Sequence, residues 1–256
     1  MGRLVRPSFR RNVNLTQLLA VLALAVLAVF PSPAVAVIIS TGDGSGNTTA
    51  PLDDPGWEYL GEFKSGTAIY LGDRWVLTAN HLGSGSTMTL LGESFNVVAG
   101  SEKQLMNPSA SGLTTLTDLK LFQIDRDPGL PLLAISQVLP GVGSEVVMIG
   151  RGRNRETDLT FFDIDTSVPS LIWTETSDFA QSDASGYRYS VGQSMRWGTN
   201  RIADDTVYDA WKVDRQQNLS VSISFDGKSV DVVAFVTKFD DTGGTAFEAQ
   251  AAIGGS

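Results

Sequence analysis

The chain contains a single histidine, His81, which follows the apolar run 75–79, and it carries a serine, Ser256, behind two glycines. A serine hydroxyl is a weak nucleophile until a base removes its proton, and imidazole suits that task near neutral pH. The imidazole then needs a carboxylate that fixes its tautomer and stabilises the cation formed during reaction. Asp118 is the leading candidate, because it stands just before the apolar stretch 119–124, which predicts a strand beside the core. These residue types together can perform nucleophilic acyl transfer.

Each residue also has a simpler interpretation when it is taken alone. A lone histidine such as His81 is as often structural as catalytic, and Asp118 alone would more often cap a strand. The joint pattern of imidazole, carboxylate and hydroxyl favours the catalytic hypothesis, which requires the three side chains to meet in space.

The surrounding residues resemble a known family. Residues 66–70, Gly-Thr-Ala-Ile-Tyr, followed by residues 74–81, Arg-Trp-Val-Leu-Thr-Ala-Asn-His, resemble the histidine box of trypsin-like serine peptidases, in which a hairpin precedes Trp-Val-Leu-Thr-Ala-Ala-His. Residues 117–121, Thr-Asp-Leu-Lys-Leu, resemble the Asp-Ile-Ala-Leu-Leu segment that carries that family's aspartate. Residues 254–256, Gly-Gly-Ser, resemble the start of its Gly-Asp-Ser-Gly-Gly motif. The resemblance runs from about Gly61 onward and keeps the family's order of histidine, aspartate and serine.

The resemblance implies a role for each of these residues. His81 would act as general base and then general acid, Asp118 would orient it, and Ser256 would attack the substrate. The backbone N–H groups of Gly254 and Ser256 would form the oxyanion hole. Gln250, six residues before the serine, would lie at the base of the specificity pocket and, being neutral, would not favour Arg or Lys side chains. The expected activity is that of a serine endopeptidase that acts on extended segments of peptides or proteins without a cofactor.

Two departures from the family pattern have consequences. Gly255 replaces the aspartate before the serine, so no carboxylate is present there to pair with a newly freed N-terminal amine. The sequence also ends at Ser256, where the family continues with a glycine pair, the pocket walls and further strands. We therefore expect this chain to be an inactive fragment of a peptidase, with its second barrel incomplete.

The first 36 residues are typical of a secretory signal peptide. Four arginines precede the apolar stretch 15–30, and an Ala-x-Ala pattern ends at Ala36. The apolar stretch is short for a membrane span, so we expect cleavage after Ala36 and a secreted or extracytoplasmic protein that does not stay inserted in the membrane.

Charge and composition exclude several classes of function. Beyond residue 36 the chain keeps 15 of its 19 basic residues and all 28 acidic ones, a formal charge of −13 that disfavours nucleic acid as a partner. There is no cysteine and only one histidine, which excludes thiolate sites and zinc sites built on several imidazoles. The acidic segments 204–205 and 239–244 lack the spacing of an EF-hand loop, so solvated turns are the better interpretation. No metal or cofactor is expected.

Short β-branched stretches separated by glycine and aspartate turns predict an all-β fold. With the resemblance, this predicts two antiparallel six-stranded-type β-barrels, one over residues 37–137 and one over 138–256, joined near the proline-containing segment 128–140. The expected strands are residues 68–71, 75–78, 87–91, 94–98, 119–124, 144–149, 159–164, 220–225 and 230–235. The basic run 150–155 is interpreted as an exposed turn.

Two alternatives to a peptidase stay open at this point. The chain could be a catalytically dead, peptidase-like binding module, for which Gly255 is the best support. It could instead be an adhesive or glycan-binding β-sandwich that uses aromatic residues such as Trp173, Trp197 and Trp211, although such residues in β proteins are more often part of the core. A separation of more than about 6 Å between the His81 and Asp118 side chains would favour the sandwich, since a triad needs hydrogen-bond reach.

Overall fold

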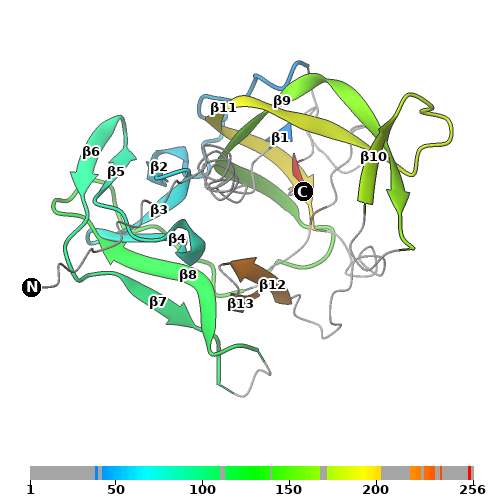
Figure 1. Ribbon diagram of the computed structural model, residues 1–256. Helices are drawn as coiled ribbons and strands as arrows, with labels where there is room; N and C mark the ends of the chain where they lie inside the picture. Colours follow the sequence, from blue (N-terminus) through cyan, green and yellow to red (C-terminus); the bar gives the residue numbers. More distant parts are fainter. Residues whose placement is uncertain are drawn as a thin grey trace, which may run out of the picture. The chain divides into compact units, whose positions relative to one another are not determined.

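The computed structural model describes residues 38–39, 42–109, 113–138, 140–167, 172–202, 220–225, 228–233, 237 and 253–254. The chain divides into two compact units, Met1–Pro33 and Ala34–Ser256, and every described residue belongs to the second. Strands dominate this part of the chain and are joined by loops and two short 3₁₀ turns (Figure 1), so the predicted all-β fold is confirmed. The signal peptide lies outside the described residues, and the division between residues 137 and 138 stays a prediction.

The larger sheet contains seven strands, and each neighbouring pair in it is antiparallel. In spatial order they are β6 (Glu93–Asn96), β5 (Thr87–Leu90), β2 (Leu60–Phe63), β3 (Gly66–Gly72), β4 (Trp75–Ala79), β8 (Leu116–Gln123) and β7 (Lys103–Met106). Val97, just after β6, forms a bridge with Ile124, just after β8. Because β6 and β8 are far apart in the strand order, this bridge requires the sheet to curl. No closed barrel is detected in the described part of the chain, so the expected six-stranded barrels are not seen there.

The expected hairpin over residues 68–78 is confirmed by β3 and β4, which pair in antiparallel register. Its turn consists of Asp73 and Arg74, whose φ angles are 48° and 65°. Two positive φ values are what a two-residue hairpin of type I′ requires, and Gly72 precedes them with a φ of 110°. The turn therefore fixes the register of the strand that leads to His81.

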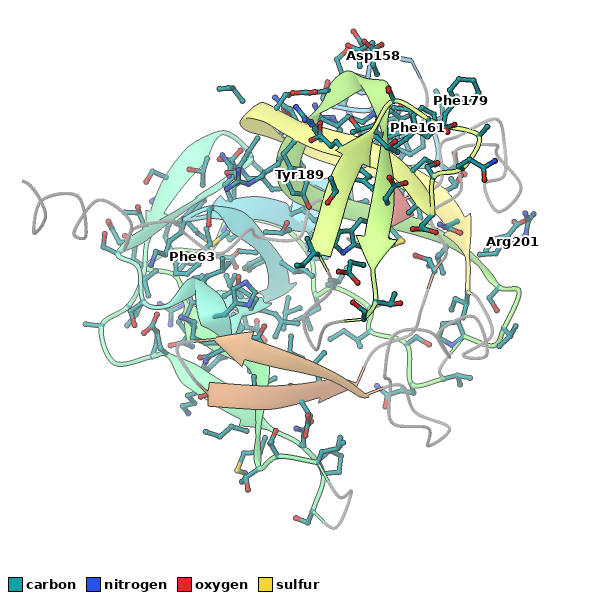
Figure 2. The ribbon with its side chains drawn as sticks, turned by 45° about the vertical axis from the view of Figure 1, so that its right-hand side comes forward. Phe63, Asp158, Phe161, Phe179, Tyr189 and Arg201 are labelled. Carbon is teal, nitrogen blue, oxygen red and sulfur yellow. The ribbon has the colours of Figure 1, made fainter. Side chains whose placement is uncertain are left out.

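The buried core of the described residues lies in the first half of the chain. It is formed by Tyr59, Phe63, Ala68, Tyr70, Val76, Leu82, Met88, Leu90, Phe95, Phe122 and Ile124. The rings of Phe63 and Phe122 pack with their centroids 4.9 Å apart. Figure 2 shows Phe63 among the side chains of this sheet. Strand β8 buries every second residue from Asp118 to Phe122, as a strand with one face on a core must.

The second half of the described chain forms smaller sheets. Strands β9 (Glu145–Asp165), β10 (Ile172–Thr176) and β11 (Ala184–Arg201) make a three-stranded sheet with β9 in the middle. Strands β12 (Ser220–Phe225) and β13 (Lys228–Val233) form the predicted hairpin, and β1 (Ile38–Ile39) pairs with β14 (Ile253–Gly254). The two strands predicted over 144–149 and 159–164 are one continuous strand, β9, so the break between them was wrong.

The basic run 150–155 is part of β9, which corrects the interpretation of an exposed turn. Arg155 is buried, and its guanidinium donates to the carbonyl oxygens of Ile39 and Gly42, each at 2.8 Å. Its Cζ also lies 3.8 Å from the ring centroid of Tyr187. Hydrogen bonds and ring stacking satisfy the charge, and the strand can therefore continue through residues that a hydrophobic pattern would place in a loop.

Thr67 is one of the residues that connect the two sheets; Arg151 on β9 also pairs with Glu62 on β2 at 3.1 Å. The hydroxyl oxygen of Thr67 on β3 accepts the backbone N–H of Arg151 on β9 at 2.7 Å. The carbonyl oxygen of Thr67 accepts the hydroxyl of Thr78 on β4 at 2.8 Å. The same residue thus bonds to both β9 and the strand that ends at the His81 turn.

Candidate active site

His81 lies in a short 3₁₀ turn, Asn80–Leu82, that follows directly on β4. Leu82 is buried and anchors the turn to the core. Gly83 ends the turn with a φ of 67°, a left-handed conformation that glycine adopts without strain, and its N–H donates to the carbonyl of Asn80 at 2.9 Å. The chain therefore stops its strand and presents His81 at the edge of the core.

Asp118 reaches the same place from the neighbouring strand. Ala79 of β4 pairs with Leu119 of β8 in antiparallel register, so the residues just beyond them, Asn80 and Asp118, lie opposite each other. The Asp118 side chain is only 4% exposed, whereas that of His81 is 25% exposed. The carboxylate is thus shielded from water while the imidazole keeps an accessible edge.

Two hydrogen bonds join the pair. The Nδ1 atom of His81 lies 2.6 Å from Oδ2 of Asp118, and the backbone N–H of His81 donates to Oδ1 at 2.8 Å. An ionised carboxylate only accepts hydrogen bonds, so opposite such a group Nδ1 of His81 is the donor, and in the neutral imidazole the lone pair then lies on Nε2. One carboxylate thereby fixes both the backbone and the ring of His81, and Nε2 is the atom that a general base uses. The structure brings together two of the residues that the sequence singled out.

The other predicted site residues are less fully covered. Ser256 and Gln250 lie outside the described residues. Gly254 is described as part of β14, where it pairs with Ile38 of β1. The predicted nucleophile, oxyanion hole and specificity pocket stay predictions.

Three residues that the sequence did not single out lie next to the His81 turn. The Lys120 ammonium donates to the carbonyl of Gly83, which ends the turn, and it pairs with Glu102. Glu102 in turn accepts the hydroxyl of Ser84. The strand pattern could have indicated Lys120, because a strand that alternates inward from Asp118 to Phe122 must also point Lys120 inward.

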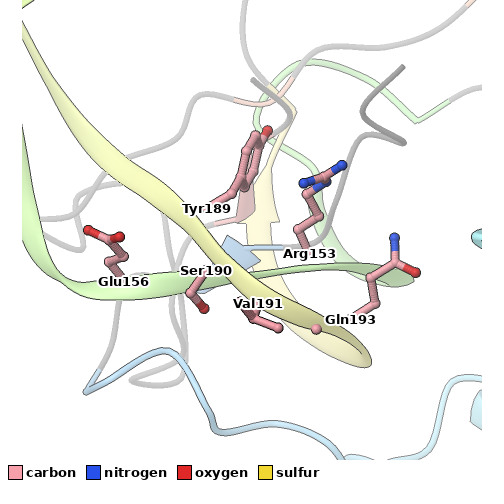
Figure 3. A pocket seen from close by; sticks show the side chains of 7 residues that line it. Arg153, Glu156, Tyr189, Ser190, Val191 and Gln193 are labelled. Atoms are coloured by element: carbon pink, nitrogen blue, oxygen red, sulfur yellow. The ribbon is translucent and has the colours of Figure 1, made fainter. Parts of the chain in front are cut away.

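A pocket elsewhere on the molecule lies between β9 and β11, lined by Arg153, Glu156, Tyr189 and residues 190–193 (Figure 3). Neither His81 nor Asp118 lines it. Arg153 lies near the Tyr189 ring, at 5.7 Å from the centroid, and Glu156 is exposed. The pocket does not belong to the candidate site.

Within the part of the chain that the structure describes, the remaining candidates form no metal site. The described residues contain no group of three or more His, Cys, Asp or Glu side chains that could hold a metal ion. The acidic segments 204–205 and 239–244 and Trp211 lie outside the described residues. Trp173 is 44% exposed, so the expectation that it belongs to the core was wrong. The Nε1–H group of Trp197 donates to the carbonyl of Thr49 at 2.8 Å. Across the described ranges, no helix is long and apolar enough to cross a membrane.

Comparisons with known proteins add a structural neighbour. No protein-family model and no curated protein matches the chain. Among solved structures, the active form of the Rv3671c protease from M. tuberculosis is similar over 80% of this chain and 88% of that chain, at 13% identity and a TM-score of 0.31. A likeness at this TM-score does not establish the family. The function is therefore inferred from the geometry of His81 and Asp118.

Proposed function

We propose that this protein is a secreted serine endopeptidase in which His81 is the general base, Asp118 its orienting carboxylate and Ser256 the nucleophile. The observation that supports the proposal best is the double contact between one buried carboxylate and both the ring and the backbone of the only histidine. A structural histidine needs one partner to be satisfied, whereas a general base needs its tautomer and its orientation fixed together.

The proposed reaction follows from the proton positions. The hydroxyl of Ser256 would attack a peptide carbonyl while Nε2 of His81 takes its proton, and Asp118 would stabilise the resulting imidazolium through Nδ1. The N–H groups of Gly254 and Ser256 would stabilise the oxyanion, and Gln250 would lie at the base of the pocket for the substrate side chain. His81 would then protonate the leaving amine, and water would hydrolyse the acyl-enzyme. No metal or cofactor takes part in these steps.

The separation of the two side chains weighs against the sandwich alternative. A glycan-binding sandwich makes no demand on the distance between His81 and Asp118, whereas 2.6 Å lies well inside the limit of about 6 Å that a triad sets. A catalytically dead module of the same fold would keep this contact, so activity has to be measured directly.

The test is reaction of the purified protein with a serine-directed phosphonate probe, together with casein hydrolysis. If the chain is an active peptidase, we expect labelling that is lost in Ser256→Ala and strongly slowed in His81→Ala. The expectation from the sequence that this chain is an inactive fragment predicts the opposite, no labelling of the unmodified protein. Substituting Ser194→Ala, a serine on β11 outside the candidate site, is the matched control and should change nothing. Labelling that His81→Ala leaves at the original rate would contradict the proposal.

A further inference from the structure

Lys120 is a charged residue where the sheet faces its core. It lies on β8 between Asp118 and Phe122, on the same face as both, and its side chain is only 5% exposed. Burying an ammonium group is unfavourable unless it is paired and hydrogen-bonded. The trypsin-like segment that residues 117–121 resemble has alanine at this position, so the resemblance does not account for the lysine.

The partners of Lys120 lie at the end of the His81 turn. Its Nζ donates to the carbonyl oxygen of Gly83 at 2.7 Å and to Oε1 of Glu102 at 3.2 Å. It also lies 5.4 Å from the ring centroid of Phe63, which packs against Phe122. The ammonium thus fills the space between the core and the residue at which the turn ends.

Glu102 extends this contact to the next residue of the loop. Its Oε2 accepts the hydroxyl of Ser84 at 2.5 Å. Burial raises the pKa of Glu102, but the hydrogen bonds from Ser84 and Lys120 outweigh that effect and hold the pKa below its usual value. Glu102 is therefore ionised near neutral pH and can balance the charge of Lys120.

We propose that Lys120 is a positioning residue for His81. Asp118 holds the start of the turn through the His81 N–H and ring, and Lys120 holds its end through the Gly83 carbonyl. Both side chains come from the same face of one strand, so the turn is fixed at both ends to a single rigid element. The catalytic consequence rests on the proposed peptidase function, but the fixing of the imidazole does not.

The test is Lys120→Met in the full chain, which keeps the length of the side chain and removes its charge and hydrogen bonds. His81 is the only histidine, so NMR of protein carrying ¹⁵N-labelled histidine reports on this one ring. We expect the variant to lose the Nδ1 proton signal through exchange with water and to show a second set of ring signals. If the peptidase is active, kcat should fall roughly 10²-fold with little change in KM, the effect of a misplaced catalytic group.

Tyr70→Phe is the matched control. Tyr70 is buried in the same core, and its hydroxyl donates to Oδ1 of Asp127 at 3.0 Å, away from the His81 turn. Its loss should lower the free energy of unfolding and leave the His81 signals unchanged. A general loosening of the sheet would disturb His81 in both variants, whereas a positioning role disturbs it in Lys120→Met alone.

A folded Lys120→Met protein with His81 signals identical to those of the unmodified protein would overturn the proposal. If that variant does not fold, Ser84→Ala decides, because it removes only an exposed hydroxyl from Glu102 and should give the same spectral change to a smaller extent; unchanged signals would again overturn it. Altered signals in a protein that no serine-directed probe labels would support the positioning role and contradict the peptidase. Labelling that is slowed in His81→Ala but unchanged in Lys120→Met would support the peptidase and contradict the positioning role.

Discussion

The seven-stranded sheet and the three-stranded sheet differ in how far their aromatic side chains are buried. In the first, aromatic rings such as Phe63 and Phe122 are fully buried. In the second, Trp173 on β10 is 44% exposed, and Phe179, in the loop between β10 and β11, is 70% exposed. Figure 2 shows Phe161 and Phe179 side by side near β9, and their centroids are 5.8 Å apart. The candidate catalytic pair lies on the first sheet, where a buried core fixes strand register and the positions of side chains.

Charge also separates the two regions. The buried cation of the first sheet, Lys120, has a carboxylate partner in Glu102. In the second sheet Arg155 donates to the backbone carbonyls of Ile39 and Gly42, and Arg151 pairs with Glu62 of the first sheet. Burial together with Arg155 lowers the pKa of Arg196. A sheet held by such polar contacts tolerates change at its apolar residues, while a sheet held by a core does not.

The largest expected effect concerns the catalytic pair. Asp118→Asn keeps the shape of the side chain but offers His81 the wrong hydrogen-bonding group, so we expect kcat for peptide hydrolysis to fall about 10⁴-fold. Asp125→Asn is the matched control, since Asp125 is an exposed carboxylate of the same region that bonds to Asn96. An equal loss in both variants would show that the first sheet is sensitive to any lost carboxylate and not to this one.

The next largest effect is the loss of stability when a side chain of the core is truncated. Phe122→Ala should lower the free energy of unfolding by about 3–5 kcal/mol, because it leaves a cavity against Phe63. Phe179→Ala should change it by no more than about 0.5 kcal/mol, because that ring is already exposed to water. Urea unfolding of the two variants gives both values. A larger loss for Phe179→Ala would reverse the comparison between the two sheets.

A smaller loss is expected from Arg155→Met. The change leaves the carbonyl group of the buried Ile39 without its donor, at a cost of about 1–3 kcal/mol, whereas water can replace the donor at the exposed Gly42. Hydrogen exchange of the amides in β9 and β1 would locate the effect. Faster exchange in β8 instead would mean that Arg155 supports the first sheet as well.

The smallest effect is a pH dependence of stability. The folded-state pKa of Glu102 is held below its unfolded value, so its contribution to stability is fully present above the unfolded value and is lost as the pH falls through the lower folded value. Urea midpoints measured from pH 6 to pH 3 should therefore fall less steeply in Glu102→Gln than in the unmodified protein. Asp43, Asp125 and Asp165 also have lowered pKa values, so only the difference between the two proteins is informative. Parallel curves would contradict the pairing of Glu102 with Lys120.

The sequence was most informative where apolar alternation and turn residues agree. The β3–β4 hairpin followed from it, because the two strands carry their own pattern and the turn between them is short. The approach of Asp118 to His81 was expected from the resemblance to the peptidase motifs. The course of β9 did not follow, since residues 150–155 carry three arginines, and partners such as the carbonyls of Ile39 and Gly42 for Arg155 lie far along the chain. Glu102 could not be linked to Lys120 either, because it belongs to no periodic segment.

Thr67 gives the molecule a point of mechanical contact between its two sheets. Its hydroxyl is engaged by Arg151 and its carbonyl by Thr78, which lies three residues before His81. A shift of β9 along its axis is therefore transmitted through Thr67 to Thr78 on β4, three residues before His81. Valine at this position would remove the hydroxyl bond and leave the ion pair between Arg151 on β9 and Glu62 on β2 to join the two sheets.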